Sequence, residues 1–181
     1  QVNAIALRPD GRIVIGGAFL YAGPVHQRCG VARLLVDGTI DPTFAPAPGD
    51  FYDGPSNDGG ITPGGVSTLA LQSDGRIVIS GFFTSVGTTA KSAIARLAED
   101  GAFDPGFNAT NPATGLPSSR LAFTTAIRAI AVIGGDKLVV GGYLTDAATA
   151  VSFPFARLNA DGSRDDTFST AVGSRQVSSG T

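Results

Sequence analysis

The chain has 181 residues, 13 basic and 15 acidic, and a formal net charge of −2. A small charge without a basic cluster argues against a nucleic-acid-binding surface, and no apolar run approaches the roughly eighteen residues of a membrane span. The 25 glycines and 11 prolines, set between short apolar runs, predict many strands joined by turns and almost no helix. The single cysteine, Cys29, rules out an intramolecular disulfide and a paired-thiol metal site.

One stretch of sequence occurs three times, and its copies begin 64 and 61 residues apart. The copies lie at 2–44, 66–107 and 127–168. A period of this length indicates a tandem-repeat architecture. Three domains are therefore expected: 1–65, repeat 1 with a Pro/Gly-rich spacer; 66–126, repeat 2 with a Thr/Pro-rich spacer; and 127–181, repeat 3 with a tail.

Each repeat opens with two apolar runs joined by a glycine-containing turn. The turns are Asp10-Gly11, Asp74-Gly75 and, in the third repeat, Gly134-Gly135-Asp136. They predict hairpins, because glycine tolerates the positive φ that a tight turn demands. A glycine near the end of the second run, such as Gly81, predicts a bulge or a close approach of two backbones.

A second hairpin follows in each repeat. It starts with Ala-Arg-Leu, passes through an Asp-Gly turn and reaches a second aspartate. The turns are Asp37-Gly38, Asp100-Gly101 and Asp161-Gly162, and the second aspartates are Asp41, Asp104 and Asp165. Two hairpins predict four antiparallel strands in each repeat.

The inner strands at 13–15, 77–79 and 138–140 are apolar at consecutive positions. Side chains in a strand alternate between its two faces, so both faces of each small sheet are expected to be buried. Sheets stacked face to face, as in propeller blades, would bury them. The predicted fold is all-β, with three tandem four-stranded antiparallel propeller-type blades. Closed propellers have about four to eight blades, so the ring is not expected to close within this chain.

Two signatures support a family resemblance. They are Ala-Leu-Arg-Pro-Asp-Gly-Arg-Ile at 6–13, repeated almost unchanged at 70–77, and Ala-Arg-Leu-Asn-Ala-Asp-Gly-Ser-Arg-Asp-Asp-Thr-Phe at 156–168. The chain resembles the delta-60 repeat family across all three repeats, and departs from it at Gly135-Asp136. The resemblance implies a propeller-type fold in a secreted or surface-attached bacterial protein, an extracellular or cell-surface location, and no shared catalytic residues.

The repeated aspartates are interpreted first as turn residues. Asp before Gly forms a turn, and the second Asp of each repeat can accept backbone N–H bonds where the chain reverses. The structural turn residues predicted on these grounds are Asp10, Gly11, Asp37, Gly38, Asp41, Asp74, Gly75, Asp100, Gly101, Asp104, Asp161, Gly162 and Asp165. Weak calcium binding at Asp161 and Asp165 is an alternative, although calcium loops end on a glutamate that is absent here. Catalysis by these carboxylates is a third interpretation.

The arginine of each Ala-Arg-Leu motif also recurs, as Arg33, Arg96 and Arg157. Each is expected to lay its aliphatic stem on the sheet and to pair its guanidinium with a neighbouring Asp. A ligand-binding ring of arginines is the alternative.

Enzymatic activity is not expected, and no cofactor is predicted. His26 is the single histidine and lies in a variable loop, with no nucleophile elbow near any serine. Asn108-Ala109-Thr110 is a glycosylation sequon, and its occupancy would support an extracellular setting.

The end repeats are as apolar as the middle one, so each end needs a neighbour: further repeats of a longer chain, a second copy that closes a six-bladed ring, or copies joined head to tail. The leading hypothesis is a non-enzymatic structural module of a bacterial filament or surface fibre, stacking head to tail. The alternative is a carbohydrate-binding adhesion segment of a larger extracellular protein. It would use exposed aromatics, for which Tyr21, Phe51, Tyr52 and Tyr143 are the candidates.

Overall fold

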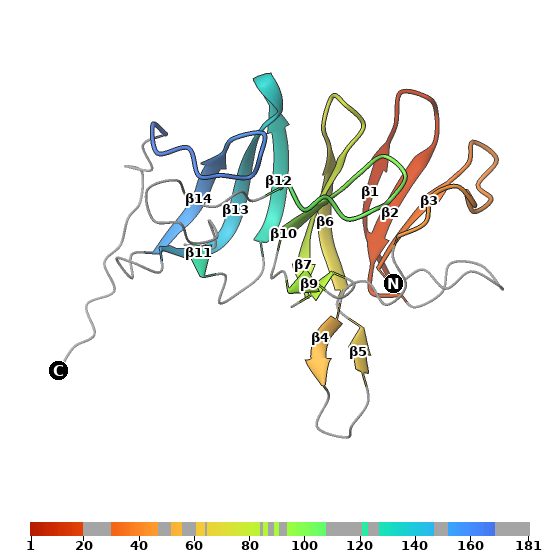
Figure 1. The fold of residues 1–181 in the computed structure, drawn as a ribbon, viewed down its shortest axis with the longest axis horizontal. Helices are drawn as coiled ribbons and strands as arrows, with labels where there is room; N and C mark the ends of the chain where they lie inside the picture. The colour runs from red at the N-terminus through yellow and green to blue at the C-terminus, as the bar shows by residue number, and fades with distance from the viewer. Residues whose placement is uncertain are drawn as a thin grey trace. The chain divides into compact units, whose positions relative to one another are not determined.

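The computed structural model describes residues 1–19, 30–46, 52–55, 61–63, 65–83, 85–86, 89–90, 94–107, 121–122, 127–146 and 152–168. The chain divides into two compact units, Gln1–Pro105 and Gly106–Thr181. Over these ranges every element is a strand except the 3-10 turn η1 (Gly134–Asp136) (Figure 1). An all-β architecture is therefore confirmed. None of the described segments forms a helix with the length and apolar character needed to cross a membrane.

Each repeat forms one antiparallel sheet. In the first sheet β1 (Val2–Leu7), β2 (Ile13–Gly17) and β3 (Val31–Leu34) lie in the order β1-β2-β3. In the second sheet β6 (Gly65–Leu71), β7 (Ile77–Phe82) and β10 (Ile94–Leu97) lie in the order β10-β7-β6. In the third sheet β13 (Lys137–Asp146) lies between β12 (Ile127–Ile133) and β14 (Ser152–Leu158), and β11 (Leu121–Ala122) pairs with the far end of β13.

The predicted four strands per repeat are wrong, because each repeat contributes three strands to its sheet; the fourth strand of the third sheet, β11, precedes the third repeat. The segment after the second hairpin turn makes a single isolated bridge in each repeat: Leu34 with Ile40, Leu97 with Phe103 and Leu158 with Arg164. The aspartate that follows ends the pairing. In the first repeat the Asp41 carboxylate accepts the Thr43 N–H at 2.9 Å, which bends the chain away from the sheet. Pro42 has no N–H with which to continue the ladder.

A small additional sheet forms in the first unit. Its strands are β4 (Tyr52–Pro55), β5 (Ile61–Pro63), β8 (Ser85–Val86) and β9 (Thr89–Ala90), in the order β5-β4-β8-β9. β4 and β5 lie in the Pro/Gly-rich spacer of the first predicted domain. Pro63 lies on the edge strand β5, and Pro55 ends β4 beyond its pairing with β8, so both lie where a sheet tolerates proline.

Strand alternation gives each main sheet two faces, which we name by their side chains. The large-residue face consists of Ile5, Leu7, Ile13, Ile15 and Leu34 in the first sheet, of Leu69, Leu71, Ile77, Ile79 and Leu97 in the second, and of Ile130, Val132, Leu138, Val140 and Leu158 in the third. The small-residue face consists of Ala4, Ala6, Val14, Gly16, Val31 and Arg33 in the first sheet, of Thr68, Ala70, Val78, Ser80, Ile94 and Arg96 in the second, and of Ala129, Ala131, Val139, Gly141, Phe155 and Arg157 in the third.

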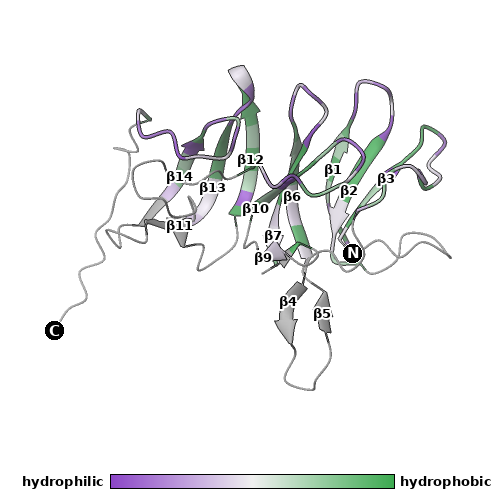
Figure 2. Ribbon diagram, in the orientation of Figure 1, coloured by the Kyte–Doolittle hydropathy of each residue, from purple (hydrophilic) through white to green (hydrophobic). Residues whose placement is uncertain are grey.

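The core of the first unit lies between the first two sheets. Val14 and Val31 on the small-residue face of the first sheet pack against the large-residue face of the second, including Ile77 and Leu97. A Cβ added to Gly16 would stand 2.7 Å from Val66 Cγ1, so the two sheets approach closely there. In Figure 2 the green of apolar residues lies mainly on strands of the main sheets, and much of the purple of polar residues lies in the turns that join them.

The second sheet is buried on both faces, as the consecutive apolar residues predict. Ile77, Val78 and Ile79 have no exposed surface although they point alternately to opposite faces. The large-residue face of the first sheet differs, because Ile5 is 69% exposed and Leu7 is 71% exposed. The same positions in the second sheet, Leu69 and Leu71, lie in or against the core.

Candidate functional site

Five Asp-Gly turns share one geometry. In the first, the Gly11 N–H donates to the Arg8 carbonyl, and Gly11 takes the left-handed conformation at φ 82°. The aspartate carboxylate accepts the backbone N–H two residues further on, which makes an Asx turn. These N–H donors are Arg12 to Asp10, Thr39 to Asp37, Arg76 to Asp74, Ala102 to Asp100 and Ser163 to Asp161, at 2.9–3.0 Å. The Thr39 hydroxyl and amide also lower the pKa of Asp37.

The second aspartate of the first repeat forms what we call the clamp, made of Arg33, Asp41 and Thr43. Arg33 Nε donates to Asp41 Oδ2 at 2.8 Å, and the Thr43 amide and hydroxyl donate to Asp41 Oδ1 at 2.9 and 2.6 Å. The Arg33 guanidinium also lies over the Phe44 ring, 5.0 Å from its centroid. Arg33 and Asp41 are both buried, so the pair joins β3 to the chain reversal inside the fold.

The other two repeats bring the corresponding arginine and aspartate together, and we call these pairs the second and third clamps. Arg96 Nε donates to Asp104 at 2.9 Å. In the third repeat Arg157 Nε donates to Asp165 at 2.9 Å, Thr167 donates to the same carboxylate, and the Arg157 guanidinium lies 4.6 Å from the Phe168 centroid.

The carboxylates of the clamps have lowered pKa values. Burial opposes ionisation of Asp41, but hydrogen bonds from Thr43 and then the Arg33 guanidinium outweigh it and lower the pKa to about 2. Hydrogen bonds from Lys137 and Thr167 lower the pKa of Asp165 in the same direction. Both groups are therefore ionised in the folded chain at neutral pH.

These shifts make the free energy of unfolding depend on pH in acid. Because Asp41 has a folded pKa of about 2 against an ordinary value of 3.8, its stabilisation is complete above about pH 4 and is lost as the pH falls towards 2. We expect the urea midpoint, followed by far-UV circular dichroism, to fall over that window. Asp41→Asn should make the fall less steep, and an unchanged slope in this variant would contradict the assignment.

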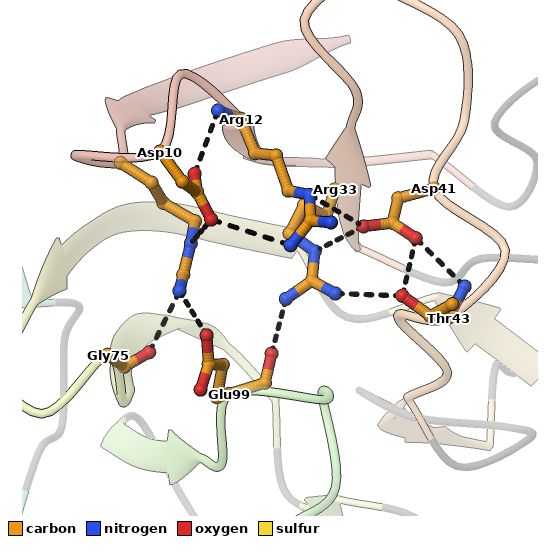
Figure 3. A network of polar contacts seen from close by, with 8 residues as sticks. Asp10, Arg12, Arg33, Asp41, Thr43, Gly75 and Glu99 are labelled. Atoms are coloured by element: carbon orange, nitrogen blue, oxygen red, sulfur yellow. Dashed lines mark hydrogen bonds and ion pairs between the residues drawn. The ribbon is translucent and has the colours of Figure 1, made fainter.

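Further polar contacts cross from the first repeat to the second, and we call this region the seam. Arg33 Nη1 donates to the Glu99 carbonyl at 2.5 Å. Arg8 donates to the Gly75 carbonyl at 3.1 Å and pairs with the Glu99 carboxylate. Figure 3 shows Arg33 placed between Asp41 and Glu99. The clamp therefore also fixes how the second sheet sits on the first.

Backbone contacts complete the seam. The Ala45 N–H donates to the Asp100 carbonyl at 2.8 Å. A Cβ added to Gly101 would stand 3.1 Å from the Phe44 ring, so the turn glycine of the second repeat receives that ring. A shallow hollow of about 450 Å³ opens here and is lined by Arg33, Thr43, Ala98, Glu99 and Asp100. The Arg33 guanidinium in its wall already donates to Asp41, Thr43 and Glu99.

Sequence reasoning missed four residues of the seam: Arg8, Thr43, Phe44 and Glu99. For Thr43 and Phe44 a signal was present, because the pair recurs as Thr167 and Phe168. For Arg8 and Glu99 the repeats give no signal, because their counterparts in other repeats are not charged.

A calcium ion at Asp161 and Asp165 would have to compete with the hydrogen-bond donors that these carboxylates already have. Asp161 Oδ1 accepts bonds from the Ser163 amide and hydroxyl, and Asp165 accepts bonds from Lys137, Arg157 and Thr167. Within the described ranges no three His, Cys, Asp or Glu side chains gather as a metal site.

Several other candidates lie outside the described residues: Asn108, His26, Cys29, Tyr21 and Phe51. Tyr52 belongs to β4, where the structure describes the backbone. Tyr143 on β13 is exposed.

A family model described as "Domain of unknown function (DUF5122) beta-propeller" matches residues 8–44, 72–107 and 136–168, more than half of the chain. The chain belongs to the DUF5122 β-propeller family. Each DUF5122 segment runs from the first hairpin turn to the phenylalanine that closes the repeat, and so contains the Asp-Gly turns and the Arg–Asp pair. This confirms tandem propeller repeats, while the delta-60 name remains a prediction. No curated protein and no solved structure matches the chain.

Proposed function

We propose that this chain is a non-enzymatic structural module whose repeats stack head to tail, as a subunit of a bacterial filament or surface fibre. The resemblance to delta-60 repeats supports the extracellular or cell-surface setting. The triplicated Arg–Asp pairs support a structural role, because each joins two parts of its own repeat. An enzyme would need one asymmetric site.

The observation that carries the proposal is the uncovered large-residue face of the first sheet. Ile5 and Leu7 are exposed there, while the equivalent Leu69 and Leu71 pack on the preceding sheet. Leaving a large apolar side chain in water costs about 1.5–3 kcal/mol relative to burial. A contiguous apolar patch of this kind marks an interaction surface. Another sheet of the same type has the shape to cover it.

Two variants test head-to-tail stacking. Leu7→Glu places a charge on the exposed large-residue face of the first sheet, and Ala131→Glu places one on the exposed small-residue face of the third. In sedimentation velocity we expect the unmodified chain to form species that grow with concentration and each variant alone to stay monomeric. A mixture of the two variants should form a 1:1 dimer, because each keeps the face that the other lacks. Ala102→Glu, in an exposed turn, is the matched control and should assemble normally.

Three results would contradict the proposal. The first is an unmodified chain that stays monomeric at all concentrations, because no second copy would then cover the exposed face. Self-association of Ala131→Glu alone would mean that two identical faces meet. A monomer that binds members of a glycan array would favour the carbohydrate-binding alternative instead.

A further inference from the structure

The contact between the first two sheets shows what a small-residue face needs in order to receive a large-residue face. Ala4, Ala6 and Gly16 leave room for the larger side chains of β6. Any side chain at Gly16 would overlap Val66 and touch Leu69. Small residues at these three positions therefore set the spacing between the sheets.

The third sheet carries the same small residues. Ala129, Ala131 and Gly141 take the places of Ala4, Ala6 and Gly16. The second sheet has Thr68 and Ser80 at two of these positions. Ala129 and Ala131 are exposed, and a Cβ on Gly141 would find its nearest neighbours at 3.8 and 3.9 Å, within its own sheet. The third sheet thus presents an open copy of the surface that the first sheet uses.

Two exposed hydrophobic residues occupy positions that are charged in the internal contact. At the seam, Arg8 pairs with the Glu99 carboxylate. The counterpart of Arg8 in the third repeat is Ile133, which is 38% exposed, and the counterpart of Glu99 in the first repeat is Val36, which is 74% exposed. Both members of the charged pair are therefore replaced by apolar side chains, one at each end of the repeat series, and these two match each other.

In the third clamp, the Arg157 guanidinium is placed to make a bond like the one from Arg33 to the Glu99 carbonyl. Arg157 bonds Asp165 and Thr167 in its own repeat but is 24% exposed, against 4% for Arg33. Among the described residues Arg157 makes no contact corresponding to the bond from Arg33 to the Glu99 carbonyl. The equivalent acceptor is the Val36 carbonyl of another copy.

Gly38, the glycine of the second hairpin turn in the first repeat, has open space beside it. At Gly101 the Phe44 ring fills the space beside the turn, whereas a Cβ added to Gly38 would have no atom within 4 Å. Phe168, the counterpart of Phe44, is half-buried. Phe168 of one copy therefore matches the space beside Gly38 of the next.

We infer that the third sheet of one copy docks on the first sheet of a second copy in the register of the internal seam, with Ile133 against Val36 and Arg157 Nη1 donating to the Val36 carbonyl. The inference rests on the proposed function and specifies its interface. It predicts that the charged pair of the internal seam can be transplanted into the contact between copies.

The test uses the Leu7→Glu and Ala131→Glu variants, which we call the blocked copies. Each has one face blocked, so the two can associate only as a 1:1 dimer. The Leu7→Glu copy offers the third sheet and receives Ile133→Arg; the Ala131→Glu copy offers the first sheet and receives Val36→Glu. Either substitution alone should weaken the dissociation constant about tenfold or more, because it buries an unpaired charge against an apolar partner. Together the two substitutions should restore the dissociation constant to within about threefold of the value for the blocked copies without them. Ala102→Arg in the Leu7→Glu copy adds the same charge elsewhere and should change it less than about twofold.

The outcomes separate this register from stacking in general. If the blocked copies associate but the double variant binds no better than the weaker single variant, head-to-tail stacking stands and the register is wrong. If the blocked copies do not associate, both the stacking and its register are overturned, and another sheet, such as a further repeat of a longer chain, covers the exposed face. Restoration by the charge pair with the control unchanged supports the inferred contact.

Discussion

Replacing Gly81 with alanine should lower the free energy of unfolding by about 3 kcal/mol. An added Cβ would stand 1.9 Å from the Gly65 carbonyl oxygen and 2.8 Å from Val66 Cα, both backbone atoms of the paired strand. Relief would require the bulge between Val66 and Thr68 to open, and with it the pairing of β6 and β7. Urea unfolding followed by circular dichroism measures the change.

Gly134→Ala is the matched control for this prediction. A Cβ there would meet no atom within 4 Å, and Gly134 is not among the glycines with a positive φ. The control should change the free energy of unfolding by less than about 0.5 kcal/mol. Equal stability of the two variants would show that the close approach of the strands is not needed.

Asp41→Asn should cost about 3 kcal/mol, because it leaves the buried Arg33 guanidinium without its counter-ion. Asparagine keeps the size of the side chain and an acceptor for the Thr43 amide, so the loss reports on the charge. The clamp also orients Arg33 Nη1 towards the Glu99 carbonyl, so the seam should loosen with it. Urea unfolding at pH 7 measures the difference.

Asp37→Asn provides the comparison in the same repeat. Asp37 also accepts an N–H two residues on, but it is exposed and pairs with no arginine of the described ranges. Its replacement should cost less than half as much as that of Asp41. A similar loss in both variants would mean that turn geometry, and not the buried ion pair, is what stabilises the repeat.

The local features of the fold follow from the sequence because they depend on neighbouring residues. An Asp-Gly pair encodes its turn within five residues, and Gly81 marked the place where two backbones come close. Apolar residues on both faces of β7 predicted burial on both sides. The pattern occurs in three repeats, which made these features recognisable from the sequence.

The fourth strand and the seam could not be predicted in the same way. Whether 40–44 pairs as a strand depends on Asp41, whose carboxylate takes the N–H of Thr43. The contact of Arg8 with Glu99 joins residues 91 positions apart and has no charged equivalent in the other repeats. Periodicity identifies what repeats share, whereas this contact depends on a difference between them.

Each clamp closes over a short span of chain, eight residues from arginine to aspartate, and lies wholly within its own repeat. Duplication or deletion of one whole repeat in the gene would therefore leave each of these Arg–Asp pairs whole. Such events would change the length of the protein in steps of one sheet, and each new junction would bring the small-residue face of one repeat against the large-residue face of another. Recombination between repeats would thus change the length of the chain without separating a clamp arginine from its aspartate.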